Sequence, residues 1–346
     1  MKKSNKTRTK LIDIAKSTGF DISTISRALR GKSGISKENR KKIIEIAKKL
    51  KYYPDYLAKG LREKKSYTIG VIINDLENPY YIEILQAINN RLLNEKYLLS
   101  IATSDWNLAN EKKIIQDFLS KRVDGIIISA LEGVNNNLNI LMENDVEFIV
   151  IDSFPIIDNV NYIYNDHKKG FEISTEYLIK NGHKDILLIL GPGQKYYSDK
   201  MVLDGFVQTL ESHNIQFNTE LFIRTNEYSL TQGYEVFKNI LRKRLINNFP
   251  NFTAIMTNDI LAAGIYKAAN ELNIKIPKDF SIFGNGNINL SEIIYPPLTT
   301  IHLPKKRIGL QSIELLLNNL NSENKIKGEK IVFDPYIVER SSVMRI

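Results

Sequence analysis

From Tyr67 onward, short apolar runs alternate with longer amphipathic stretches, and this rhythm constrains the fold more than any other feature. The apolar runs have the length of buried strands, and polar turn residues follow each of them. Strands that alternate with helices form parallel sheets covered by helices on both faces, so the pattern predicts two doubly wound α/β lobes. The predicted strands are Thr68–Ile73, Leu98–Ala102, Gly125–Ser129, Phe148–Asp152, Ile186–Gly191, Leu221–Arg224, Ala254–Thr257 and Phe280–Phe283.

The composition is that of a globular protein with more than one domain. The chain has 346 residues, of which 43% are hydrophobic and 25% are charged. No apolar run is long enough to predict a membrane span, and the basic N-terminus is not followed by the apolar stretch of a secretory signal. The absence of cysteine excludes disulfides and thiolate metal sites and fits a reducing cytoplasm, where we expect the protein to act.

Positive charge is concentrated at one end of the chain. Residues 1–65 hold 20 Lys and Arg against 6 Asp and Glu, a net charge of +14, whereas the remaining residues carry a net charge of −5. Such a field attracts a polyanion, although a charge run alone is also what a solvated face looks like. The pattern inside the basic segment therefore decides between these readings.

The basic segment predicts three short helices. The first is Leu11–Thr18, which Gly19 ends, and the second is Ile22–Leu29, with Asp21 as its N-cap. Ser36 caps the third. Three such helices, with a tight glycine turn between the first two, form a helix-turn-helix domain. The residues expected to face inward are Leu11, Ile14, Ala15, Thr18, Ile25, Ala28, Leu29, Ile43, Ile44, Ala47 and Leu50.

The outer side of the second helix carries small donor side chains and one arginine. Ser23, Thr24, Ser26 and Arg27 lie there, and residues of these types enter a DNA major groove. The alternative is a three-helix bundle with an ordinary polar face. The charge excess and Arg27 favour DNA binding.

Several motifs resemble the LacI/GalR (lactose/galactose repressor) family of bacterial transcription factors, and the resemblance covers nearly the whole chain. In the basic head they are Leu11–Leu29, Tyr53-Pro54 and Ala58-x-x-Leu61. In the body they are Asn78-Pro79-Tyr80-Tyr81, Lys121–Ile127, Gly191-Pro192, Asn258-Asp259, Ala262-x-Gly264, Pro277-x-Asp279 and Pro296–Ile301.

The resemblance implies that the second helix reads the major groove. Ile22, Ser23 and Arg27 then fall at base-reading positions, and Arg27 suits a guanine edge. Because the Ile22 side chain has no hydrogen-bonding group, it could recognise only the shape of the DNA or a thymine methyl group. Thr24 and Ser26 are expected at phosphates, which position the protein without specifying sequence.

Residues 54–66 resemble the family's hinge, which folds into a helix in the minor groove. The resemblance implies that Leu61 wedges into a central base step, and Gly60 beside it weakens the intrinsic helicity. A plain linker is the alternative. The hinge residues expected to contact DNA are Ala58, Lys59, Leu61 and Arg62.

The resemblance also implies an all-α helix-turn-helix head on a periplasmic-binding-protein-like body. The expected ranges are 1–53 for the DNA-binding domain, 54–66 for the hinge, 67–164 plus 297–326 for the first lobe, and 165–296 plus 327–346 for the second.

The family binds its effector in the cleft between the lobes. Each matching aromatic residue is equally compatible with core packing, and Asn258 with capping a helix. The expected effector-site residues are Tyr80, Tyr81, Asp152, Asn165, Tyr196, Ser198, Val202, Tyr228, Asn258 and Gly286.

Three of these positions depart from the family. Val202 replaces an arginine that grips the effector, Gly286 replaces an aspartate that bonds sugar hydroxyls, and Asn165-Asp166 replaces an Asp-Asn pair. Without charged hydrogen bonds an ordinary free sugar is in doubt. Lys195 and Lys200 are alternative cations for a phosphate, or simply solvated side chains.

The sequence shows no sign of catalysis or of a cofactor. Nucleotide-binding and nucleophile motifs are absent, and none of the four histidines is spaced to pair with a nearby carboxylate, so neither an enzyme nor a metal site is expected. The resemblance makes a dimer the default, because the leucine-heptad tail that makes tetramers of one family member does not follow Tyr336–Val338.

The sequence thus predicts a cytoplasmic transcriptional regulator, most simply a repressor, that binds a pseudo-palindromic operator as a homodimer. Its effector is a sugar, a sugar phosphate or another metabolite. One alternative keeps DNA binding but takes its input from a partner protein. Another is a solute-binding protein, which the basic head and the missing export signal oppose.

Overall fold

The computed structural model describes residues 9–53, 65–131, 137–153, 157–192, 197–246 and 248–346, with the side chains of 197–199 excepted. The chain divides into two compact units, Met1–Lys64 and Lys65–Ile346, here called the head and the body.

The head is a bundle of three helices, as predicted: α1 (Leu11–Thr18), α2 (Ile22–Leu29) and α3 (Lys37–Lys49). Local signals set their ends. Gly19 ends α1 with φ of 77°, the Asp21 carboxylate accepts the Thr24 N–H, and the Ser36 hydroxyl accepts the Asn39 N–H. The buried core consists of Ile14, Ile25, Ala28, Ile43 and Ala47.

One inward prediction for the head is wrong. Ile44 is 36% exposed, because its neighbour Ile43 already occupies the core-facing position of α3 and adjacent helical residues point about 100° apart.

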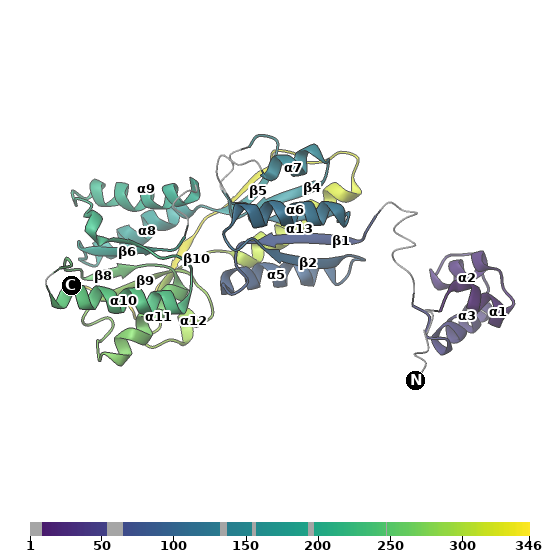
Figure 1. Cartoon of the computed structure of the whole chain (residues 1–346), viewed down its shortest axis with the longest axis horizontal. Coiled ribbons are helices and arrows are strands. Elements are labelled where there is room, and N and C mark those ends of the chain that lie inside the picture. Colours follow the sequence, from purple (N-terminus) through teal and green to yellow (C-terminus); the bar gives the residue numbers. More distant parts are fainter. Residues whose placement is uncertain (1–8, 54–64, 132–136, 154–156, 193–196, 247) are drawn as a thin grey trace. The chain divides into compact units, whose positions relative to one another are not determined.

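The body contains two six-stranded sheets, one in each lobe (Figure 1). The first has the order β11-β5-β4-β3-β1-β2, and all of its pairs are parallel. Helices α5 and α13 share a core with one face, and α6 and α7 share one with the other. The elements are β1 (Thr68–Ile73), β2 (Leu98–Thr103), β3 (Gly125–Ile128), β4 (Glu147–Ile151), β5 (Asn161–Asn165), β11 (Lys330–Phe333), α5 (Pro79–Leu92), α6 (Leu108–Ser120), α7 (Asn137–Glu143) and α13 (Lys305–Asn321).

The second sheet has the order β12-β10-β9-β8-β6-β7, in which only β12 is antiparallel to its neighbour. Figure 1 shows α8 and α9 on one face and α10 and α11 on the other. The elements are β6 (Ile186–Leu190), β7 (Phe222–Arg224), β8 (Ala254–Met256), β9 (Ser281–Gly286), β10 (Thr299–His302), β12 (Tyr336–Val338), α8 (His167–Lys180), α9 (Tyr197–Ser212), α10 (Leu230–Leu245), α11 (Asp259–Glu271), α12 (Leu290–Ile293) and the 3-10 turn η1 (Thr219–Leu221).

The sheets contradict two of the predicted lobe boundaries. Strand β10 lies within the range assigned to the first lobe, yet it pairs with β9 of the second sheet. Strand β11 lies within the range assigned to the second lobe, yet it pairs with β5 of the first. The chain therefore crosses between the lobes after β5, β10 and β11, and the last two crossings come later than 297 and 327. The lobe to which a strand belongs is set by the strand it pairs with, which can be far away in the sequence. Neither the composition nor the periodicity of a segment reveals that partner.

Candidate DNA-binding surface and effector pocket

The outer face of α2 presents the predicted side chains to solvent. Ser23 and Arg27 are exposed and Ile22 is 45% exposed, whereas Thr24 and Ser26 are half-buried. Arg27 Nη2 lies 3.4 Å from Thr24 Oγ1, so the guanidinium extends along the same face. The hydroxyls of Ser23 and Thr24 both donate to Asp21.

The second predicted DNA-contacting segment lies outside the described residues. This applies to Ala58, Lys59, Leu61 and Arg62. Their assignment stays a prediction from the sequence.

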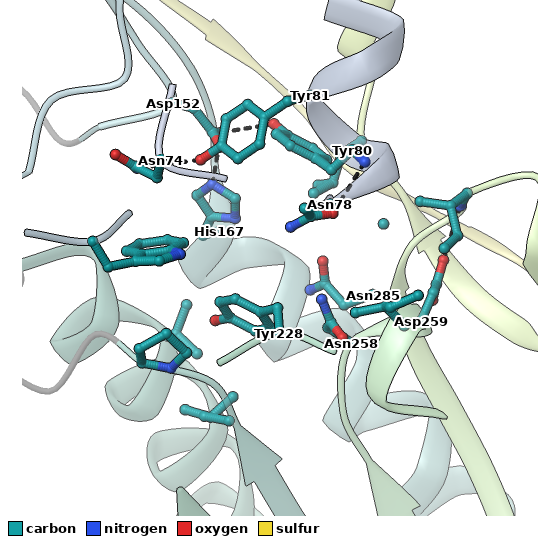
Figure 2. Close-up of a pocket in the computed structure, with 18 of the residues that line it drawn as sticks. Asn74, Asn78, Tyr80, Tyr81, Asp152, His167, Tyr228, Asn258, Asp259 and Asn285 are labelled. Atoms are coloured by element: carbon teal, nitrogen blue, oxygen red, sulfur yellow. Dashed lines mark hydrogen bonds and ion pairs between the residues drawn. The ribbon is translucent and has the colours of Figure 1, made fainter. Parts of the chain in front are cut away.

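A pocket in the body lies where strands of both sheets end, and Figure 2 shows side chains from the two lobes converging on it. The first lobe contributes the loop after β1, the start of α5 and the segment after β4. The second contributes the starts of α8 and α11 and the end of β9. Among the described residues the wall includes Asn74, Asn78, Tyr80, Tyr81, Trp106, Asp152, Ser153, His167, Phe171, Pro192, Val202, Tyr228, Asn258, Asp259, Asn285, Gly286 and Ile288.

Asp152 is the centre of a hydrogen-bonded cluster on one wall. Its Oδ1 accepts the Tyr80 hydroxyl at 2.8 Å and the Asn165 amide at 3.3 Å, and it lies 3.0 Å from His167 Nε2. Burial, followed by the nearby Asp152 charge, raises the pKa of Tyr80, so its hydroxyl remains a donor. These partners tie the carboxylate into the pocket wall, and because all three use Oδ1, Oδ2 remains available to accept a hydrogen bond from a ligand.

Buried polar side chains hold the hydroxyl of Tyr81 in place. Its hydroxyl accepts from Asn74 Nδ2 at 3.2 Å and lies 3.3 Å from Ser129 Oγ. The rings of Tyr80 and Tyr81 pack edge to face, with centroids 5.3 Å apart. Both residues therefore line the pocket as predicted, and both also belong to the buried core of the body.

Trp106 and Tyr228 form an aromatic wall that bridges the lobes. Their ring centroids are 5.8 Å apart at an interplanar angle of 50°. Trp106 adopts φ of 55°, an unusual conformation for a bulky residue, and this backbone directs the loop after β2. Sequence reasoning predicted Tyr228 and missed Trp106.

Asn258 serves both of the roles left open by its sequence. Its Oδ1 caps α11 by accepting the Leu261 N–H at 3.0 Å, and the side chain lines the pocket. Because Oδ1 is used in the cap, Nδ2 is the group left for a ligand. Asn78 repeats the arrangement, since its Oδ1 accepts the Tyr80 N–H at 3.0 Å.

The structure explains the glycine that replaces the family's aspartate. Gly286 has φ of 130°, and a Cβ there would lie 3.5 Å from Asp259 Oδ2. Asp259 is buried and accepts from the Ile288 N–H, the Ser291 hydroxyl and the Thr300 hydroxyl. Burial raises the pKa of this carboxyl. A second carboxylate at position 286 would face both backbone strain and charge repulsion.

No lysine or arginine is among the described residues that line the pocket. Val202 lines it at the position of the family's arginine. Lys200 is exposed and Lys195 lies outside the described residues. The described wall therefore supplies amides, aromatic faces and the Asp152 cluster.

Other predicted pocket residues are distributed as follows. Asn165 is buried behind the wall and reaches it through Tyr80 and Asp152. Tyr196 and the side chain of Ser198 lie outside the described residues.

Two histidines lie beside carboxylates that are distant from them in the sequence. His167 lies 3.0 Å from Asp152, and His213 Nε2 lies 3.1 Å from Glu176. His167 follows β5, a strand that the sequence pattern did not predict. The position of His167 after the end of a strand could therefore not be predicted either. Within the described ranges there is no cluster of three potential metal ligands, and no helix is long and apolar enough to cross a membrane.

Comparisons with known proteins agree with both units. The pattern described as "Bacterial regulatory proteins, lacI family" matches residues 10–55, and the "Periplasmic binding protein-like domain" matches residues 175–343. A protein named HTH-type transcriptional repressor PurR from Histophilus somni (strain 2336) is 32% identical, with 96% of this chain and 98% of the relative covered. The PurR of Pasteurella multocida (strain Pm70) is 29% identical, with 96% and 97% covered.

Solved structures show the same fold. The lac repressor dimer bound to operator and the anti-inducer ONPF has a TM-score of 0.84 at 24% identity, with 98% of this chain and all of that chain covered. A LacI family regulator from Enterococcus faecalis V583 with bound ribose has a TM-score of 0.69 at 27% identity, with 81% and 99% covered. The resemblance read from the sequence is thereby confirmed, and this chain belongs to the lacI family of bacterial regulatory proteins.

Proposed function

We propose that the protein is a cytoplasmic transcriptional repressor that binds a pseudo-palindromic operator as a homodimer and responds to a small molecule in the pocket. The observation that carries the proposal is the solvent-exposed face of α2, with Ile22, Ser23 and Arg27, within the first 65 residues, whose net charge is +14. Relatives at about the same length are named transcriptional repressors.

On DNA, α2 lies in the major groove and the hinge residues in the minor groove. Arg27 reads a guanine, and Leu61 enters the central step of the operator. Exposed apolar side chains of the body support a self-association surface. Ile293, the last residue of α12, is 76% exposed, and Tyr295, two residues further on, is 91% exposed.

The pocket favours an uncharged effector. A phosphate needs charge-assisted partners in a desolvated site, and the described wall has neither lysine nor arginine. Asn78 and Asn258 each have an amide NH₂ left to donate, and Tyr80, Trp106 and Tyr228 offer flat apolar faces. These groups suit a flat ring with neutral acceptors, such as a nucleobase, rather than a sugar phosphate, and Val202 and Gly286 leave out the charged pair that grips a free sugar in the family.

Binding of such a molecule shifts the equilibrium between two arrangements of the lobes. The shift is as large as the difference in its affinity for the two arrangements. The altered spacing of the two hinges then changes the fraction of dimers that fit the operator.

Footprinting of the DNA around the protein's own coding region tests the proposal. We expect a protected, two-fold symmetric site, whose protection changes on adding cell metabolites. A lack of protection anywhere in that region and in random genomic fragments would argue against a repressor.

Calorimetry tests the effector class. The panel is glucose, ribose, hypoxanthine and adenosine, matched with glucose 6-phosphate, ribose 5-phosphate and AMP. Tighter binding of a phosphorylated compound than of its neutral counterpart would contradict the uncharged class. If no compound binds at millimolar concentration, control by a partner protein becomes the better account.

A further inference from the structure

Asp21 organises the N-terminal end of α2 through three hydrogen bonds. Its Oδ1 accepts the Ser23 hydroxyl at 2.5 Å and the Thr24 N–H at 2.8 Å, and its Oδ2 accepts the Thr24 hydroxyl at 2.6 Å. The Thr24 N–H bond is an ordinary helix cap. The two hydroxyl bonds are additional, and they fix the direction of both protons.

Fixing these protons determines what the surface can bind. A hydroxyl has one proton, and those of Ser23 and Thr24 are given to Asp21. The exposed Ser23 hydroxyl therefore turns only lone pairs outward, whereas the half-buried Thr24 hydroxyl already accepts from Arg27 Nη2 at 3.4 Å. The same hydrogen bonds lower the pKa of Asp21, so this group is also an acceptor at neutral pH. The exposed side chains of Asp21 and Ser23 at the start of α2 thus present oxygen acceptors.

Acceptors distinguish the parts of a DNA duplex. Phosphate oxygens are acceptors themselves, so this cluster has no proton to offer them. In the major groove the base donors are N4 of cytosine and N6 of adenine, whereas guanine and thymine present acceptors at the corresponding positions. Arg27, six residues after Asp21 and carrying only donors, has the opposite preference.

We propose that Asp21 is a specificity-determining residue, which makes the first turn of α2 select a cytosine or adenine edge. This rests on the proposed placement of α2 in the major groove. It replaces the prediction that Thr24 contacts a phosphate, because the hydroxyl proton needed for that contact is already donated within the helix. Each half-site then contains a base with an exocyclic amino group for the Asp21 cluster and a separate guanine for Arg27.

Selection of binding sites from a random duplex library by the full-length chain tests this. The unmodified chain is compared with Asp21→Asn and Ser23→Ala. Asparagine keeps the helix cap but adds an amide donor and cannot take both hydroxyl protons. Ser23→Ala removes one acceptor and leaves the cap intact. We expect both variants to relax the same base pair, with its preference for C or A falling at least about fivefold.

Two further variants serve as controls. Ser36→Asn exchanges one capping residue for another on α3, so the selected motif should not change. Arg27→Ala should relax a different base pair from the one that Asp21→Asn relaxes. Thr24→Val should leave the dependence of affinity on salt concentration unchanged, because a lost phosphate contact would lower that slope.

The possible outcomes separate the two proposals. If the unmodified chain selects G or T at the pair that the variants affect, or if Asp21→Asn and Ser23→Ala both return the original motif, the role of Asp21 is wrong while DNA binding stands. If the unmodified chain enriches no motif, sequence-specific DNA binding itself is contradicted.

Discussion

Gly191 lies beneath the ring of Tyr228 on the pocket wall. A Cβ at position 191 would come within 2.3 Å of ring atoms, so the aromatic wall requires glycine there. Gly191→Ala should displace Tyr228 and change the environment of Trp106, the one tryptophan of the chain. The emission of that tryptophan measures the change.

Gly170→Ala is the matched control for this prediction. Its Cβ would meet nothing closer than 3.6 Å, and alanine is the better helix former by up to about 1 kcal/mol. Tryptophan emission should stay as in the unmodified protein. Equal emission spectra for Gly191→Ala and the unmodified chain would mean that Tyr228 does not depend on this glycine.

His183 joins the second lobe to the C-terminal segment as a neutral ring. Its Nε2 lies 2.9 Å from the Met344 carbonyl oxygen and its Nδ1 lies 2.9 Å from Thr253 Oγ1. Burial lowers the pKa of His183 below its usual 6.5. The unfolded chain therefore takes up this proton at a higher pH than the folded one, and the stabilisation present above pH 6.5 is lost as the pH falls through the folded-state pKa.

Urea unfolding at several pH values checks the prediction for His183. The unmodified protein should lose stability between about pH 7 and pH 5, and His183→Gln should lose less over the same interval. A parallel decline in both proteins would assign the pH dependence to other groups, such as His302, whose pKa burial also lowers.

At the scale of elements, α2 acts as a unit that reads bases. Arg27→Ala should reduce discrimination at one base pair of each half-site by about 1–3 kcal/mol. Arg30, exposed at the end of the same helix, is the control, because Arg30→Ala should change affinity equally for all sequences. Competition binding with single-base variants of the selected site measures both effects. Equal losses on every sequence for Arg27→Ala would contradict its role in reading a base.

Helix α13 is joined to both lobes through its first residue. The buried ammonium of Lys305 donates to the carbonyl oxygens of Gly286 at 2.5 Å and Asn287 at 3.0 Å, and it lies 3.2 Å from Glu83 of α5. Burial lowers the pKa of Lys305. The cation therefore links the pocket edge on β9 to the helix pair α5 and α13.

Removing this link should be costly. Lys305→Met leaves a carboxylate and two carbonyls without their cation, and we expect a loss of about 3 kcal/mol in the free energy of unfolding. The exposed neighbour Lys306 supplies the control, since Lys306→Met should change stability by less than about 0.5 kcal/mol. Urea unfolding measures both free energies. Similar unfolding curves for Lys305→Met and Lys306→Met would contradict the proposed role of Lys305 in joining the lobes.

At the scale of the whole molecule, local signals were sufficient for the head. Asp21, Gly19 and Ser36 fix helix ends through contacts within four residues, and the three helices follow from them. The allocation of β10 and β11 to the lobes failed because it depends on pairing between segments far apart in the sequence.

The pocket residues likewise fall into those that sequence motifs predicted and those that depend on the three-dimensional fold. Tyr80, Tyr81, Asp152, Val202, Tyr228 and Asn258 were found because they match positions in motifs. Trp106 was missed because an irregular loop brings it to the wall, His167 because it follows an unpredicted strand, and Asn285 because β9 continues past its predicted end at Phe283. The spatial reason for Gly286, a positive φ beside a buried carboxylate, is visible only once Asp259 has been placed.

The most direct test of the whole account is the equilibrium affinity of the full-length chain for its selected duplex and for a shuffled duplex of equal length at the same salt concentration. We predict a ratio of about 10³ or more in favour of the selected site, with one dimer bound per duplex. Equal affinity for the two duplexes would show that the positive charge of the head holds DNA without reading it, and would contradict the account.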